Sequence, residues 1–82
     1  MSVEVRFFAA ARAAAGCAQE TTAVAPELTI DDLVAGLGTR HGEALTEVLA
    51  RSTFLVDGQR AAPGTAVCAG AVVDVLPPFA GG

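Results

Sequence analysis

The last eight residues contain the group in this sequence that is best placed to do chemistry. They read VLPPFAGG, so that two prolines, a phenylalanine and an alanine precede a terminal pair of glycines. Gly82 has no Cβ, and its carboxylate is therefore the least hindered acyl group that a chain end can offer. Two interpretations are open: the terminal carboxylate is the working group, or the end is frayed and its glycines carry no function.

Residues of the usual catalytic types are few and do not combine. His41 is the only histidine, and the sequence around it offers neither a nucleophile nor a group that would orient it as a base. A charged histidine near a helix end is the favoured interpretation. Asp31 and Asp32 are adjacent and do not share a helix face, which favours a structural role over a catalytic pair. An enzyme in its own right is therefore a distant third among the function classes.

The two cysteines also give no site. Cys17 and Cys68 are far apart in the sequence, form no CxxC motif and have no second cluster that would complete a zinc site. The favoured interpretation is that both cysteines are small, semi-buried apolar side chains. A disulfide between them is not excluded by the sequence. We predict no metal site.

Composition narrows the class of protein. The chain has 82 residues, enough for one small domain, and 52% of them are hydrophobic. The chain has nine acidic residues, five arginines and no lysine, which gives a formal charge of −4. Such a chain is a poor candidate for binding nucleic acid and is better suited to a basic protein partner. No apolar run approaches the roughly 18–20 residues of a membrane span, and no signal peptide is recognisable. We expect a cytoplasmic protein without membrane contact.

The first third of the chain predicts two paired strands joined by a short helix. Residues 3–7 alternate apolar and polar side chains, which is typical of a half-buried strand. The run AAARAAAG, residues 9–16, predicts a short helix or tight connection that ends at its glycine. Residues 19–24 predict a weaker second strand.

The remainder predicts a main helix followed by strands. Thr29 is an N-cap candidate with two carboxylates in the first turn, and an apolar stripe at helical spacing follows until Gly42. A second helical piece is expected at 43–50, and strands at 53–56 and 71–76. Asp57-Gly58 is a hairpin signal. This order predicts an α+β roll, with a mixed sheet of four to five strands and one main helix packed on one face.

Four stretches carry a resemblance over essentially the whole chain: VEVRFFAAARAAAG, TIDDLVAGL, the VDG turn and AGAVVDVLPPFAGG. They resemble the ubiquitin-like β-grasp family and, within it, the sulfur carriers that serve as small subunits of molybdopterin synthase. The resemblance implies a β-grasp domain over residues 1–76 and an extended Gly-Gly tail over residues 77–82.

The resemblance also implies a mechanism for Gly82. A ubiquitin-activating-type adenylyltransferase would use ATP to adenylate the terminal carboxylate, and a sulfur donor protein would displace AMP to leave a thiocarboxylate. The large subunit of molybdopterin synthase would then receive this sulfur for a pterin precursor in its own active site, during molybdenum cofactor biosynthesis. On this view the chain is a carrier that binds no cofactor itself.

A partner-binding surface is predicted beside the tail. The alternation of apolar and polar residues places Phe8 and Leu76 on strand faces that are otherwise polar. The two residues are therefore either parts of one exposed docking patch or unrelated surface residues. Arg12 is implied by the resemblance as a polar rim. The tail is expected to enter the partner in an extended conformation and contact it through a series of residues, namely Pro77, Pro78, Phe79, Ala80 and Gly81.

Two alternatives use the same chain end. One is a sulfur carrier for the thiazole of thiamine or for another sulfur-transfer pathway. The other is a ubiquitin-like modifier that sends its activated glycine to a target lysine. The lack of lysine argues against chains of such a modifier but not against single conjugation.

Overall fold

Five strands form one mixed sheet with the strand order β2-β1-β5-β3-β4 in the computed structural model, which describes residues 1–78. The two central strands β1 and β5 run parallel, and each other neighbouring pair is antiparallel. The elements follow in the order β1 (Ser2–Phe7), α1 (Ala9–Ala15), β2 (Gln19–Ala23), α2 (Ile30–His41), α3 (Glu43–Leu49), β3 (Thr53–Val56), β4 (Gln59–Arg60) and β5 (Val72–Leu76). The predicted α+β roll is confirmed, with five strands.

The connection between β1 and β2 has the predicted helix. Phe8 is the N-cap of α1, in an extended conformation (φ −122°, ψ 152°) and without a side-chain cap. Ala9 follows at φ 50°, a left-handed conformation that is uncommon for alanine. The helix ends at Gly16, whose φ is 79°. Glycine adopts this left-handed conformation without strain because it has no Cβ. The chain thereby reverses within one short helix.

The main helix α2 begins at a capping box. The Thr29 hydroxyl accepts the N–H of Asp32, while the Asp32 carboxylate accepts the N–H of Thr29. These bonds satisfy backbone N–H groups that would otherwise have no partner at the helix start. The positive end of the helix dipole also stabilises the negative carboxylates in the first turn. Gly42 ends α2 and leads directly into α3. The structural role predicted for Asp32 is thus confirmed.

The predicted hairpin joins β3 and β4. Asp57 and Gly58 lie at φ 50° and 84°, and Val56 pairs with Gln59, so these two residues form a two-residue turn with both φ values positive. The Asp57 carboxylate also accepts the N–H of Val72, 2.9 Å away, and so ties the hairpin to β5.

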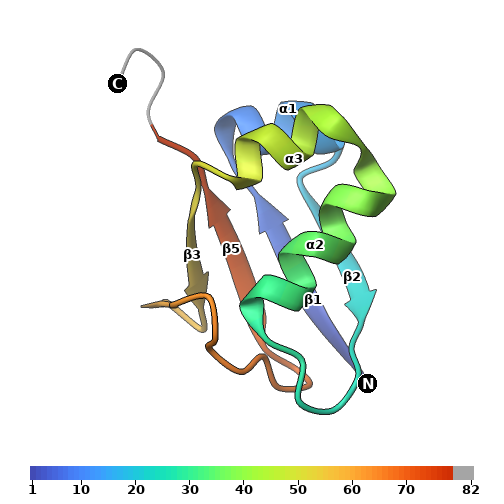
Figure 1. Cartoon of the computed structure of the whole chain (residues 1–82), viewed down its shortest axis with the longest axis vertical. Helices are drawn as coiled ribbons and strands as arrows, with labels where there is room; N and C mark the ends of the chain where they lie inside the picture. Colours follow the sequence, from blue (N-terminus) through green and yellow to red (C-terminus); the bar gives the residue numbers. More distant parts are fainter. Residues whose placement is uncertain (79–82) are drawn as a thin grey trace.

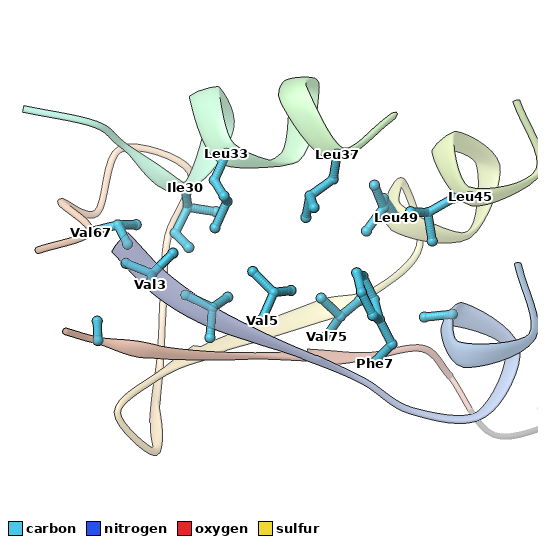
Figure 2. Close-up of a cluster of buried hydrophobic side chains, with 13 residues drawn as sticks. Val3, Val5, Phe7, Ile30, Leu33, Leu37, Leu45, Leu49, Val67 and Val75 are labelled. Atoms are coloured by element: carbon cyan, nitrogen blue, oxygen red, sulfur yellow. The ribbon is translucent and has the colours of Figure 1, made fainter. Parts of the chain in front are cut away.

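The core lies between one face of the sheet and the helix layer. Figure 2 shows apolar side chains of α2 and α3 pointing down onto the side chains of β1 and β5. Alternate residues of β1 supply Val3, Val5 and Phe7, each at most 2% exposed. The helices supply Ile30, Leu33, Leu37, Leu45 and Leu49. This arrangement follows from period-2 burial in the strands and helical spacing in α2.

The helices leave one face of the sheet free. In Figure 1, α2 and α3 cross in front of the sheet, and α1 lies at the end where β1 and β5 finish. We call the opposite face the outer face. No helix within residues 1–78 is long and apolar enough to cross a membrane.

Candidate functional site

Phe8 and Leu76 lie next to each other on the outer face. In the parallel register Phe7 is paired with Val75, and the N–H of Phe8 donates to the Val75 carbonyl at 3.3 Å. Phe8 and Leu76 each follow an inward-facing residue and therefore both point outward. Phe8 is 42% exposed and Leu76 is half-buried. The structure thus brings these two residues together, while their contact with a partner stays a prediction.

Two further apolar residues extend this surface. Val72 lies on β5, four residues before Leu76, and Leu55 of β3 is paired with Asp74 of β5. Both are half-buried. We call the set Phe8, Leu55, Val72 and Leu76 the outer patch. Sequence reasoning missed Leu55 because every residue of its run TFLV is apolar or β-branched, so alternation did not reveal which side chains point outward.

A charged pair lies in the middle of the outer patch. Arg6 of β1 donates through Nε to Asp74 Oδ1 at 2.6 Å and through Nη2 to Oδ2 at 3.1 Å. Asp74 is only 7% exposed. The hydrogen bond to Asp74, and the negative charge of this carboxylate, raise the pKa of the Arg6 guanidinium above its ordinary value. Arg6 therefore stays charged at any physiological pH.

The other predicted partner contacts follow from these strands. Arg12 is exposed on α1, and its backbone N–H donates to the carbonyl of Phe8, the first residue of the outer patch along the chain. Its role as a polar rim stays a prediction. Pro77 is half-buried and Pro78 is exposed. They follow directly on the last residue of β5, so the predicted tail begins at the outer patch. The remaining predicted residues, Phe79, Ala80, Gly81 and Gly82, lie outside the described residues.

His41 belongs to a separate polar cluster that sequence reasoning did not find. Its Nε2 lies 2.5 Å from Oε1 of Glu20, and Arg40 donates to Oε2 of the same carboxylate at 2.6 Å. The His41 ring also meets Phe7 edge-on, with centroids 5.8 Å apart. The cluster fastens the end of α2 to strand β2. Glu20 orients the imidazole, but the described contacts supply no nucleophile, so we assign this cluster a structural role.

The remaining candidates form no reactive centre in the described part of the chain. Cys17 and Cys68 are both free, with Cys17 packed partly against the core and Cys68 exposed. Residues 1–78 contain no group of three or more acidic, histidine or cysteine side chains placed to hold a metal ion. Within residues 1–78, the outer patch with Pro77 and Pro78 beside it is therefore the candidate site.

A comparison with protein-family models gives one match. The model described as the ThiS family matches residues 5–82, which includes the whole sheet except the first residues of β1. A search of curated proteins found no match.

Solved structures give close matches over the whole chain. SAMP1 from Haloferax volcanii, a small archaeal modifier protein, has a TM-score of 0.87 and 29% identity, covering 100% of both chains. A putative molybdopterin converting factor subunit 1 from Pyrococcus furiosus has a TM-score of 0.86 and 26% identity, covering 96% of this chain and 99% of that one. A complex of subunits 1 and 2 of the molybdopterin-converting factor from Helicobacter pylori contains a chain with a TM-score of 0.70 and 26% identity, with full coverage of both.

Proposed function

The chain belongs to the ThiS family of ubiquitin-like sulfur carriers, and from this premise we propose that it is the small subunit of a molybdopterin synthase. It carries sulfur as a thiocarboxylate on Gly82 and delivers it to a pterin precursor in the active site of a large subunit. The single observation that carries the proposal is the placement of the outer patch beside the start of a tail that ends in Gly81-Gly82.

Forming the thiocarboxylate on Gly82 needs two partner proteins, an activating enzyme and a sulfur donor. An adenylyltransferase joins the Gly82 carboxylate to the α-phosphate of ATP, and pyrophosphate leaves. Sulfur at the sulfide oxidation level then attacks the acyl carbon, the bond to the phosphate oxygen breaks, and AMP leaves. The product is –C(O)S⁻, whose sulfur is a better nucleophile than the oxygen it replaced. This chain contributes an unhindered acyl carbon and the surface that brings it to each partner.

The residues after β5 suit delivery into another protein. Pro77 and Pro78 have no N–H to donate, so the chain cannot continue as a central strand. Proline also favours extended polyproline geometry, at roughly 3.1 Å per residue, so six residues would reach about 18 Å. A chain that is already restricted loses less conformational entropy when it enters a partner.

The large-subunit partner is supported by one relative. In the Helicobacter pylori structure, the chain similar to this one is in complex with subunit 2 of the molybdopterin-converting factor. The same surface would serve the adenylyltransferase and the large subunit in turn, because the outer patch adjoins the tail that both must receive.

A modifier role is the second candidate. It is favoured by the similarity to SAMP1, which covers both chains completely. The activated glycine would then form an amide with a lysine of a target protein instead of taking up sulfur for a cofactor. The absence of lysine in this chain would limit such a product to single additions rather than chains. Carriage of sulfur toward a thiazole uses the same thiocarboxylate and differs only in the acceptor.

The first test is the mass of the C-terminal peptide. Protein taken from its own host, or incubated with an activating enzyme, ATP and a sulfur donor, should show one oxygen replaced by sulfur at Gly82. Sulfur found instead as a persulfide on Cys17 or Cys68 would leave a carrier role but contradict this mechanism. Thiocarboxylated protein should then be offered a pterin precursor with a large subunit, a thiazole-forming system and lysine-bearing proteins. Transfer to the pterin is the expected result, and transfer to either of the others would replace the proposal.

The second test separates a working tail from a frayed end. Deleting Gly82, or adding one residue after it, should abolish sulfur transfer and leave the thermal midpoint unchanged. An extended chain advances roughly 3.3 Å per residue, so either change misplaces the acyl carbon. A displacement of about 1 Å already costs on the order of a hundredfold in rate. Normal transfer by either variant would return the tail to the frayed-end interpretation.

A further inference from the structure

The ion pair between Arg6 and Asp74 lies at the centre of the outer patch, and the sulfur chemistry does not account for it. A purely apolar face would not need it, because only Asp74 of the pair is buried, and burying a carboxylate costs free energy that an apolar residue would not. The two residues are 68 positions apart in the sequence, and only the parallel pairing of β1 and β5 brings them together.

Asp74 is fully engaged inside the protein. Each of its two oxygens accepts one N–H of Arg6, and its side chain is 10% exposed. Val72 and Leu76 flank it along β5, and Leu55 lies opposite on β3. This carboxylate is therefore covered by the outer patch. Its effect is to hold the guanidinium of Arg6 in one orientation.

Arg6, in contrast, has hydrogen-bonding capacity left over. A guanidinium has five N–H donors, and two of them reach Asp74, which leaves three. The side chain is 45% exposed and makes no other hydrogen bond within residues 1–78. In the free protein, water accepts these protons. A partner that covers the outer patch removes this water and must supply an acceptor, because an unsatisfied charged donor in an interface is costly.

The charges around Arg6 indicate what kind of acceptor fits. Asp74 lies across from it, and Glu4 lies two residues earlier on the same strand and the same face. Both carboxylates stabilise the charged guanidinium. Gln19, the residue opposite Arg6 on β2, is neutral. Arg60 lies on the same row, but three strands away from Arg6, beyond Asp74 and Leu55. Near the guanidinium one cation thus already faces two anions, and a third carboxylate from a partner placed there would be repelled. A main-chain carbonyl or a side-chain amide oxygen would not.

We propose that Arg6 is a specificity-determining residue, which selects partner proteins that present a neutral hydrogen-bond acceptor within an apolar contact surface. The inference rests on the proposed function, because it takes the activating adenylyltransferase and the large subunit as the proteins that cover the outer patch. Arg6 takes no part in the sulfur chemistry. It determines which surfaces can dock beside the tail.

The test replaces the pair by apolar residues. Arg6→Met/Asp74→Leu removes both charges together, so no unpaired carboxylate stays buried, and the thermal midpoint reports whether the fold is kept. Affinity is measured by titration against a purified ubiquitin-activating-type adenylyltransferase from the same organism. Binding about tenfold weaker than wild type is expected, the size of one charge-assisted hydrogen bond. Arg6→Lys is a second variant, which keeps Asp74 paired but loses the planar fork, and it should also bind more weakly.

Glu4→Gln is the matched control for the kind of acceptor. It removes a neighbouring charge and leaves the Arg6 donors in place, so binding should stay at the wild-type level if the acceptor is neutral. Tighter binding of Glu4→Gln would mean that the partner presents a carboxylate, which contradicts the proposal. Unchanged or tighter binding of the apolar double variant, or of Arg6→Lys if the double variant does not fold, would overturn the role of Arg6 while leaving the proposed function intact. Failure of the wild-type protein to bind would overturn both.

Discussion

The contact between α2 and α3 allows a stability prediction with an internal control. Gly36 and Gly38 both lie inside α2, but a Cβ would meet different surroundings at the two positions. At Gly36 nothing lies within 4 Å, whereas at Gly38 the Thr46 Oγ1 of α3 would be 2.6 Å away. Gly36→Ala and Gly38→Ala therefore change helix propensity equally and differ only in packing.

The expected magnitudes follow from this difference. Alanine is favoured over glycine in a helix interior by about 1 kcal/mol, so Gly36→Ala should be more stable than wild type by about that amount. Gly38→Ala has the same gain, but Thr46 Oγ1 must move, and it currently donates to the Gly42 carbonyl at 3.0 Å. Losing this bond costs about 1 kcal/mol, and separating the helices instead costs about 1–3 kcal/mol. Gly38→Ala should therefore be less stable than Gly36→Ala by at least about 1 kcal/mol.

Thermal and urea unfolding of the two variants measure this prediction directly. In a domain of this size, about 1 kcal/mol corresponds to a shift of about 4–8 °C in Tm. In a Thr46→Ala background the nearest remaining side-chain atom is the Cβ at 3.5 Å, an ordinary contact, so Gly38→Ala should become as stabilising as Gly36→Ala. If Gly38→Ala raised Tm as much as Gly36→Ala in the wild-type background, the close approach of the two helices would be refuted. Both variants should be thiocarboxylated at the wild-type rate, because the helix layer lies opposite the outer face.

Three other predictions concern the tail, the outer patch and the helix cap. Phe8→Asp should weaken partner binding by about thirtyfold, the effect of losing about 2 kcal/mol at an interface anchor. It should not lower Tm, because an aspartate at the uncapped start of α1 is a favourable N-cap. Wild-type affinity would show that Phe8 is not a contact. Gly81→Val should block sulfur transfer, assayed by mass spectrometry, at unchanged Tm, and normal transfer would exclude a narrow channel for the tail. Thr29→Ala should lower the free energy of unfolding, measured with urea, by about 1 kcal/mol, because the capping box is lost. Thr29→Ser is the control, because serine keeps the capping hydroxyl. Equal stability of the two variants would contradict the cap.

Leu76 illustrates how the structure changes the choice of variants. If Leu76 were fully exposed, as alternation along its strand predicts, Leu76→Asp would be a harmless probe of the predicted docking surface. In the structure, Leu76 is half-buried and lies on the same strand and face as Asp74, two residues away. A second carboxylate there would repel the first and be partly desolvated. Leu76→Ser tests the same contact without adding charge, so weaker binding with an unchanged fold is the expected result.

Local features were accessible from the sequence because their physical causes act within a few residues. The capping box joins Thr29 to Asp32, three residues later, and the glycine that ends α1 allows one positive φ. The Asp57-Gly58 turn depends only on the backbone conformation of its own two residues. Alternation along β1 likewise indicated which of its side chains are buried. The exposure of Phe8 followed from the same period of two.

Contacts between distant segments depended on strand order and register, which no local pattern carries. The placement of β5 between β1 and β3 joins Arg6 to Asp74 and sets Leu55 beside them. The pairing of β2 with β1 turns Glu20 toward the helix layer, where it meets His41 across 21 positions of sequence. A shift of one residue in either register would turn these side chains to the opposite face. The sequence by itself therefore determined the elements, their caps and the chain end on which the proposed chemistry rests, whereas only the tertiary structure decided which charges and apolar side chains share a surface.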